Sequence, residues 1–139
     1  VPEVNVRNIE RLAQNLYICP PSAGQYLALQ SLDHKEYFES HKDRYEKNRT
    51  TLLKALPQLG FENILPPDGA FYLYADIKKF ELSSDKLVRK ILNEAHIAIT
   101  PGTDFDTVRG VNTVRFSFSC SEADTLEAIK RLSDWKVSL

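Results

Sequence analysis

One stretch near the end of the chain limits the possible folds more than any other: residues 97–119, where two apolar segments flank a proline–glycine loop. The second segment alternates apolar side chains (Val114, Phe116 and Phe118) with polar ones (Arg115, Ser117 and Ser119). A period of two is typical of a strand with one buried face. The sequence therefore predicts a half-buried strand at 111–119, whose single charged residue, Arg115, lies on the polar face.

Arg115 is the candidate ligand-binding residue of this strand. A guanidinium group among small serines, behind a shaped loop, is suited to a two-pronged hydrogen bond with a carboxylate. The alternative is a surface or ion-paired arginine at a sheet edge, because most charged side chains are exposed. The local sequence favours the alternative.

Composition places the chain among soluble globular proteins and excludes several classes. It has 139 residues, 42% hydrophobic and 27% charged, which is enough for one domain with one core. The net charge of −1 provides no field that would favour nucleic acid or an acidic membrane. No apolar run approaches the roughly 20 residues that a bilayer-spanning helix needs. Cys19 and Cys120 lack metal-ligand spacing and are expected to be reduced, buried thiols of a cytoplasmic protein.

The spacing of apolar residues predicts the order of the elements. Helices are expected at 5–16, 23–32 and 35–59, with Pro57 tightening the last turn of the long helix and Gly60 ending it. Strands are expected at 61–65 and 70–77 around a turn at 66–69, and a helix follows at 84–95. The apolar segment that begins at Ile97 is expected to be a further strand, ahead of the proline–glycine loop. A terminal helix begins after Ser121, whose spacing to Asp124 is that of a capping box. The predicted fold class is α+β, a small sheet packed against helices, with residues 1–33 in a different layer.

Other motifs with possible chemistry have simpler structural explanations. Ser83 to Lys86 matches S-x-x-K, but it stands at a predicted helix start where Ser84 is expected to be a cap. Asp104 and Asp106 fit a turn that bonds to its own backbone better than a metal site. The five glycines are scattered singly and form no phosphate loop. The chain thus lacks a complete catalytic set, and the residues alone leave its function open.

Three motifs, in this order, carry a resemblance to a known family: Pro67-Asp68-Gly69-Ala70-Phe71-Tyr72-Leu73, Ile97-Ala98-Ile99-Thr100-Pro101-Gly102-Thr103-Asp104-Phe105 and Val114-Arg115-Phe116-Ser117-Phe118-Ser119. Together they resemble the C-terminal part of the class I/II pyridoxal-phosphate-dependent aminotransferases, the aspartate aminotransferase superfamily. His96 and Asp106 stand where that family commonly has glycine, so a left-handed backbone is expected at either residue, or a different turn.

The resemblance implies a domain organisation and a role for Arg115. Residues 1–33 would be the helical end of the large domain and its linker, and 34–139 the small domain, with 34–59 as the interdomain helix. Arg115 would bind the α-carboxylate of the substrate of an aminotransferase, which moves an amino group between an α-amino acid and a 2-oxo acid.

The resemblance also implies what this chain does not contain. The Schiff-base lysine and the groups that bind pyridoxal 5'-phosphate would lie upstream of Val1, and the absence of Met at position 1 fits a truncated start. We therefore expect no catalytic, cofactor-binding or metal-binding residue in the chain, and no activity from it alone. The parent protein is expected to be a cytoplasmic homodimer without nucleic-acid or membrane partners. A lyase or synthase of the same superfamily and a non-catalytic carboxylate-binding or dimerisation module are the alternatives.

Overall fold

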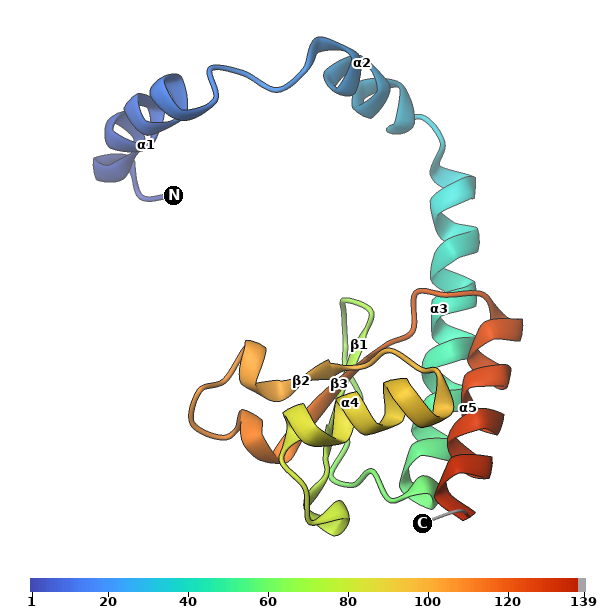
Figure 1. Cartoon of the computed structure of the whole chain (residues 1–139). Helices are drawn as coiled ribbons and strands as arrows, with labels where there is room; N and C mark the ends of the chain where they lie inside the picture. Colours follow the sequence, from blue (N-terminus) through green and yellow to red (C-terminus); the bar gives the residue numbers. More distant parts are fainter. Residues whose placement is uncertain (138–139) are drawn as a thin grey trace. The chain divides into compact units, whose positions relative to one another are not determined.

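The computed structural model describes residues 1–137, which form two compact units, one from Val1 to Glu39 and one that begins at Ser40. Each unit is described by itself. The helices are α1 Glu3–Leu16, α2 Ser22–Ser31, α3 Lys35–Ala55, α4 Ser84–Ala95 and α5 Glu122–Val137, and the strands are β1 Tyr72–Asp76, β2 Thr100–Pro101 and β3 Thr113–Ser117 (Figure 1). The boundary between the units falls within α3. The expected division into residues 1–33 and 34–139 stays a prediction.

The first unit holds α1 and α2, and neither helix buries any residue. Their apolar side chains are exposed, for example Leu12 at 61% and Leu29 at 62%. Between the two helices, Ile18 adopts a left-handed backbone with φ 69°, and two prolines follow at positions 20 and 21. Both predicted helices are present, because each is encoded by local spacing.

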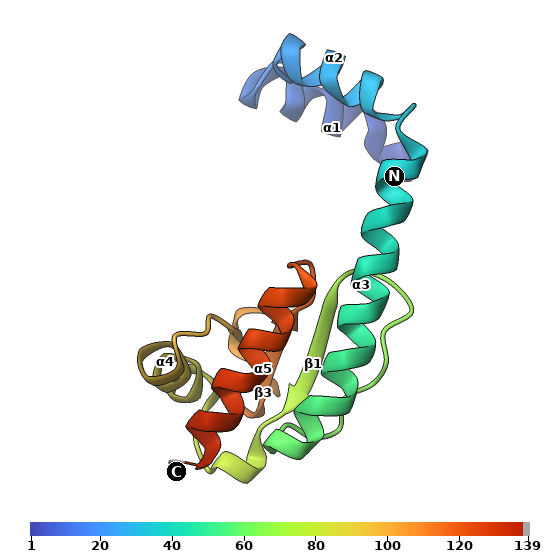
Figure 2. The same cartoon turned by 90° about the vertical axis from the view of Figure 1, so that its right-hand side faces the viewer.

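The second unit contains a three-stranded antiparallel sheet, whose strands lie in the order β1-β3-β2. In the ladder, Leu73 lies opposite Phe116 and Ala75 opposite Val114, and all four side chains are buried. They form one core cluster with buried residues from all three helices of this unit, such as Leu52, Ile91 and Leu132. In Figure 2, β1 is seen between α3 and α5. The α+β fold class is confirmed, with the helices packed on one face of the sheet.

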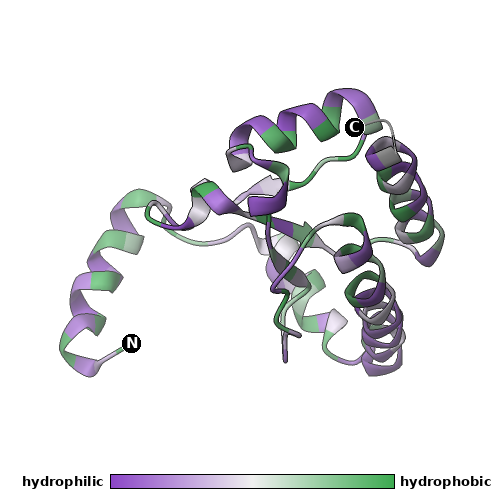
Figure 3. Ribbon diagram, turned by 90° about the horizontal axis from the view of Figure 1, so that it is seen from below, coloured by the Kyte–Doolittle hydropathy of each residue, from purple (hydrophilic) through white to green (hydrophobic). Residues whose placement is uncertain are grey.

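The long helix ends as its sequence predicts. It is α-helical to Ala55, and Leu56–Leu59 forms a turn of 3-10 helix with Pro57 near its start. Gly60 follows in a left-handed conformation, φ 96°. Hydrophobic and hydrophilic residues alternate in bands along the helices (Figure 3), and in α3 the inward stripe includes Asn48 and Leu52.

Two predictions about the strands are wrong in extent. Residues 61–65 form no strand, because Phe61 turns into the core and Glu62 makes only an isolated antiparallel bridge with Asp76. The segment at 97–105 contributes only the two residues of β2 to the sheet.

The thiols also differ from expectation. Both cysteines are free, but both are exposed, so their predicted burial is wrong. Cys19 lies in the connection between α1 and α2, and Cys120 lies in the connection between β3 and α5.

Candidate carboxylate-binding site

Arg115 lies on the middle strand of the sheet, on the face opposite the core. It stands opposite Tyr74 of β1 and Thr100 of β2. Its neighbours along the strand, Val114 and Phe116, are 0% and 5% exposed, whereas Arg115 is half-buried. The predicted alternation of faces is therefore confirmed.

Two aromatic rings contact the Arg115 guanidinium. Its Cζ lies 4.0 Å from the centroid of the Tyr72 ring and 4.0 Å from the centroid of the Phe105 ring. Tyr72 comes from β1, and Phe105 comes from the loop that follows β2. Tyr74 meets the same Phe105 ring edge-on, with centroids 6.4 Å apart.

Within residues 1–137, no carboxylate and no hydrogen-bond acceptor pairs with the Arg115 side chain. This excludes, for the described residues, the alternative in which Arg115 is an ion-paired arginine of the sheet. Since a guanidinium carries five donors, its in-plane edge is available to an acceptor from outside the described chain.

The loop between β2 and β3 is held by its own backbone. Phe105 N–H and Asp106 N–H both donate to the Gly102 carbonyl, at 3.0 and 2.9 Å. A Cβ added at Gly102 would lie 2.6 Å from the Gly110 carbonyl oxygen, so the two glycines meet with no room for a side chain. This contact closes the loop that carries Phe105.

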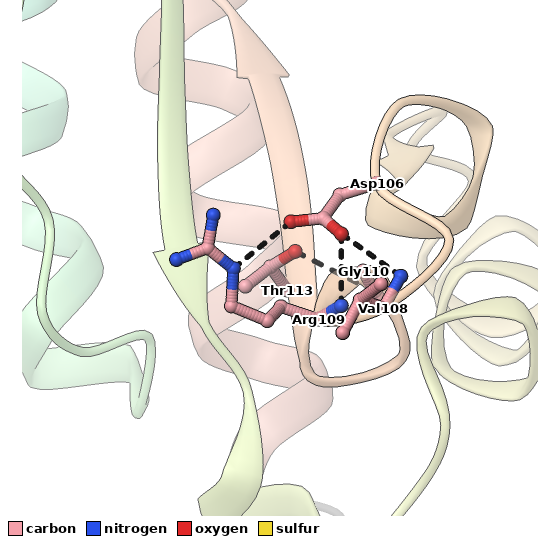
Figure 4. A network of polar contacts seen from close by, with 5 residues as sticks. All are labelled: Asp106, Val108, Arg109, Gly110 and Thr113. Atoms are coloured by element: carbon pink, nitrogen blue, oxygen red, sulfur yellow. Dashed lines mark hydrogen bonds and ion pairs between the residues drawn. The ribbon is translucent and has the colours of Figure 1, made fainter.

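Asp106 stabilises the same loop, as Figure 4 shows. One of its oxygens accepts from the backbone N–H groups of Arg109 and Val108, both at 2.9 Å, and the other accepts from Arg109 Nε at 3.1 Å. These bonds, chiefly those from the Arg109 and Val108 backbones, lower the pKa of Asp106 below its ordinary value. The prediction of a self-bonded turn is confirmed. No group of three or more acidic, histidine or cysteine side chains within the described residues is arranged to hold a metal ion.

His96 and Asp106, which stand where the resembling family commonly has glycine, differ in backbone conformation. His96 ends α4 in a left-handed conformation, φ 57° and ψ 41°. Asp106 is not among the residues with positive φ, so the turn differs there.

The S-x-x-K motif forms no reactive pair in the part of the chain that the structure describes. Ser83, not Ser84, is the residue before the helix, so the predicted cap is wrong. The Ser84 hydroxyl is buried without a hydrogen-bond partner among the described residues, while Lys86 is exposed.

An end of β3 is fixed by a residue whose role the sequence did not reveal. Asn48 of α3 is 2% exposed, and its Nδ2 donates to the carbonyls of Phe118 and Cys120, at 3.1 and 2.9 Å. The helical spacing placed Asn48 on the inward stripe, and a polar residue at such a position signals a buried hydrogen bond.

The fold and this arrangement together define a class of domain: a helix-backed antiparallel sheet with an arginine on its open face. The model of the family "Aminotransferase class I and II" matches residues 2–132. The chain belongs to this family. Its resemblance to the family is therefore confirmed.

Named relatives and solved structures agree with this membership. The valine–pyruvate aminotransferase of Mycobacterium tuberculosis is 38% identical over 97% of this chain and 35% of its own length. A crystal structure of an aminotransferase from Mycobacterium tuberculosis has a TM-score of 0.88 at 37% identity, covering all of this chain and 36% of that one. The aromatic aminotransferase of Pyrococcus horikoshii has a TM-score of 0.82 at 25% identity, covering 95% of this chain and 36% of that one. The chain spans about a third of the length of the curated relatives it matches.

Proposed function

We propose that the protein to which this chain belongs, here called the parent protein, is a pyridoxal-phosphate-dependent aminotransferase. It would move an amino group between an α-amino acid and a 2-oxo acid, and Arg115 would bind the substrate's α-carboxylate. Membership of the family supports the reaction class, since the relatives described above are named aminotransferases. The observation that carries the role of Arg115 is its position: a half-buried cation on the open face, with no anionic partner within residues 1–137.

The chemistry of Arg115 fits a carboxylate ligand. A guanidinium group offers parallel N–H donors at the spacing of the two carboxylate oxygens, and such charge-assisted pairs are among the strongest hydrogen bonds in proteins. Because Arg115 is on the middle strand, paired to a neighbour on each side, its backbone is fixed. A carboxylate bound there would be held in one orientation, which is the means by which binding aligns a substrate bond for reaction.

We expect the cofactor to bind outside the residues that the structure describes. The positions on the face that carries Arg115 include Tyr72, Tyr74, Thr113 and Ser117, and none of the strand residues on this face is a lysine. We therefore assign pyridoxal 5'-phosphate and its lysine to the rest of the parent protein. As a simple check, the 139-residue chain mixed with pyridoxal phosphate should show no stoichiometric, site-specific aldimine absorbance.

The remaining expectations are part of this proposal. The partners would be two small molecules, an amino acid and a 2-oxo acid, and the parent protein would be a cytoplasmic homodimer. No helix within the described residues is long and apolar enough to cross a membrane.

The test is Arg115→Ala in the parent protein, with steady-state kinetics for an amino acid and a 2-oxo acid acceptor. Loss of a bidentate, charge-assisted pair should lower kcat/KM about 100- to 1,000-fold. Arg131→Ala is the matched control, because Arg131 lies on α5 and pairs with Glu127 at 2.8 Å on the helix-covered side.

Two results would contradict the proposal. Unchanged amino-acid kinetics in Arg115→Ala would remove the assigned role of Arg115. Release of many equivalents of a 2-oxo acid per enzyme, with no acceptor present, would replace the transferase by a lyase.

A further inference from the structure

Two aromatic rings contact the Arg115 guanidinium, one from the neighbouring strand β1 and one from the loop that follows the other neighbouring strand, β2. The Arg115 Cζ is 4.0 Å from the centroids of both the Tyr72 and the Phe105 rings. β3 is the middle strand; Tyr72 belongs to the strand on one side, and Phe105 follows the strand on the other. Within the described chain the two rings make no contact with each other, so they are not stacked together on one side of the cation.

The two rings leave the N–H donors of the guanidinium free to bind a carboxylate. All five N–H donors lie in the plane of the group, whereas aromatic rings attract its cationic face. An arginine with a long flexible side chain samples many rotamers when it has no partner. Two rings at 4.0 Å restrict those rotamers without using any donor.

The rings are themselves fixed by the fold. Tyr72 lies opposite Ser117 in the ladder, two pairs along from Tyr74 and Arg115, so it shares their face. The backbone of Phe105 is bonded to Gly102, and its ring meets Tyr74 edge-on. Neither ring needs a ligand to take its place beside the guanidinium.

We propose that Tyr72 and Phe105 are positioning residues that preorganise Arg115 to bind a carboxylate. This inference rests on the proposed role of Arg115 and goes beyond it, because it assigns two further residues that act through Arg115. A purely structural role is the alternative. In that case the rings would stabilise the sheet and would not change carboxylate affinity.

The experiment uses ring-removing and ring-retaining variants of the parent protein. Tyr72→Leu and Phe105→Leu keep apolar bulk but remove the aromatic face, while Tyr72→Phe and Phe105→Tyr are the matched controls. We would measure kcat, KM for the amino acid, and the inhibition constant of propionate, a carboxylate without an amino group. Each leucine variant should weaken propionate and substrate binding about 3- to 10-fold, and each ring-retaining variant should stay within about twofold of the wild type.

A double-mutant cycle separates an effect through Arg115 from an independent one. If the rings act through Arg115, adding Phe105→Leu to Arg115→Ala should cause almost no further loss of propionate affinity. An additive loss would overturn the inference, as would wild-type propionate affinity in both leucine variants. If a leucine variant fails to fold, a fluorinated phenylalanine at position 105 keeps the shape and weakens the ring's attraction for a cation. Wild-type propionate affinity with that residue would likewise overturn the inference.

The outcomes distinguish the two proposals. If Arg115→Ala leaves amino-acid kinetics unchanged, the proposed function itself fails. If Arg115→Ala is strongly impaired and the leucine variants are not, only the positioning role fails.

Discussion

Replacement of Asn48 by leucine should strongly destabilise the second unit. Asn48 is 2% exposed, and its single Nδ2 group serves two backbone carbonyls in the segment that follows β3, those of Phe118 and Cys120. Leucine has a similar volume but no donor, so both carbonyls would lose this protein partner. The bonds also connect α3 to the end of the strand that carries Arg115, so the substitution tests what holds that strand end in place.

The magnitude follows from the two lost bonds. A buried polar group left unsatisfied costs about 1–3 kcal/mol, so two carbonyls cost about 2–6 kcal/mol. Burying the leucine side chain offsets about 1 kcal/mol of this. We expect the free energy of unfolding to fall by about 1–5 kcal/mol, a large share of the about 5–15 kcal/mol typical of a whole domain. Asn48→Asp should cost at least as much, because it sets a carboxylate against two carbonyl oxygens.

The assay is urea unfolding followed by the fluorescence of Trp135, the only tryptophan of the chain. Trp135 is 5% exposed and stacks on Phe80, with ring centroids 6.0 Å apart, so its emission reports on the second unit. The control is Thr51→Ala, one turn along α3, which removes only a bond from the Thr51 hydroxyl to the Lys47 carbonyl. That control should change the free energy of unfolding by less than about 0.5 kcal/mol. If Asn48→Leu changed it as little, the argument from unsatisfied carbonyls would be refuted.

Three further substitutions test the packing of the loop between β2 and β3, the N-terminal cap of α5 and the loss of stability at acid pH. Gly102→Ala should lower the free energy of unfolding by more than about 2 kcal/mol, because the new Cβ would lie 2.6 Å from the Gly110 carbonyl oxygen and 2.7 Å from that of Thr113. The measurement is the same urea titration, and the control is Gly69→Ala, where the added Cβ has open space around it. Ser121→Ala removes a cap in which the Asp124 N–H donates to the Ser121 hydroxyl at 3.0 Å, so thermal unfolding should show a loss of about 1 kcal/mol. Burial alone would raise the pKa of Asp76, but bonds from Lys78 bring it below 3.8, so Asp76 stabilises the fold above pH 3.8 and loses this effect as the pH falls further. The stability difference between wild type and Asp76→Asn should accordingly shrink below that pH, and a difference that grew there would contradict the sign.

Features with a local cause could be predicted from the sequence. The burial of Val114 and Phe116 follows from their alternation with polar residues, and each is buried in the structure. The end of α3 follows from Pro57 and Gly60, since the missing donor and the left-handed residue act within one turn.

Features that depend on pairing between distant segments could not be predicted. Residues 61–65 have strand-like composition, yet no neighbouring segment offers them a ladder beyond the single bridge at Glu62. β-propensity reflects packing against such neighbours more than any backbone preference, so composition alone overestimates the strand. The brevity of β2 has the same origin, since Thr100 and Pro101 are the only residues of its segment that pair with β3.

The candidate site likewise has one part that the local sequence predicts and one part that depends on the pairing of distant segments. Its face could be predicted, because Arg115 belongs to a strand with a period of two. The two rings could not, since Tyr72 and Phe105 come from separate segments that only the folded sheet brings together. A partial signal existed in β1, where Tyr72 and Tyr74 alternate with the buried Leu73 and Ala75, so both tyrosines had to share one face.

Arg115 also helps to specify the fold that presents it. A slip of one residue in the pairing of β3 would turn Arg115 toward the core and bring Val114 and Phe116 to the open face. Such a slip would place an unpaired charge among Leu73, Ala75 and the buried helix residues, at a cost of several kcal/mol. The same slip would lose the burial of two large apolar side chains, at about 1.5–3 kcal/mol each. The charge that we assign to substrate binding therefore penalises every register in which it would be buried, so the binding residue and the strand register are fixed by the same alternation.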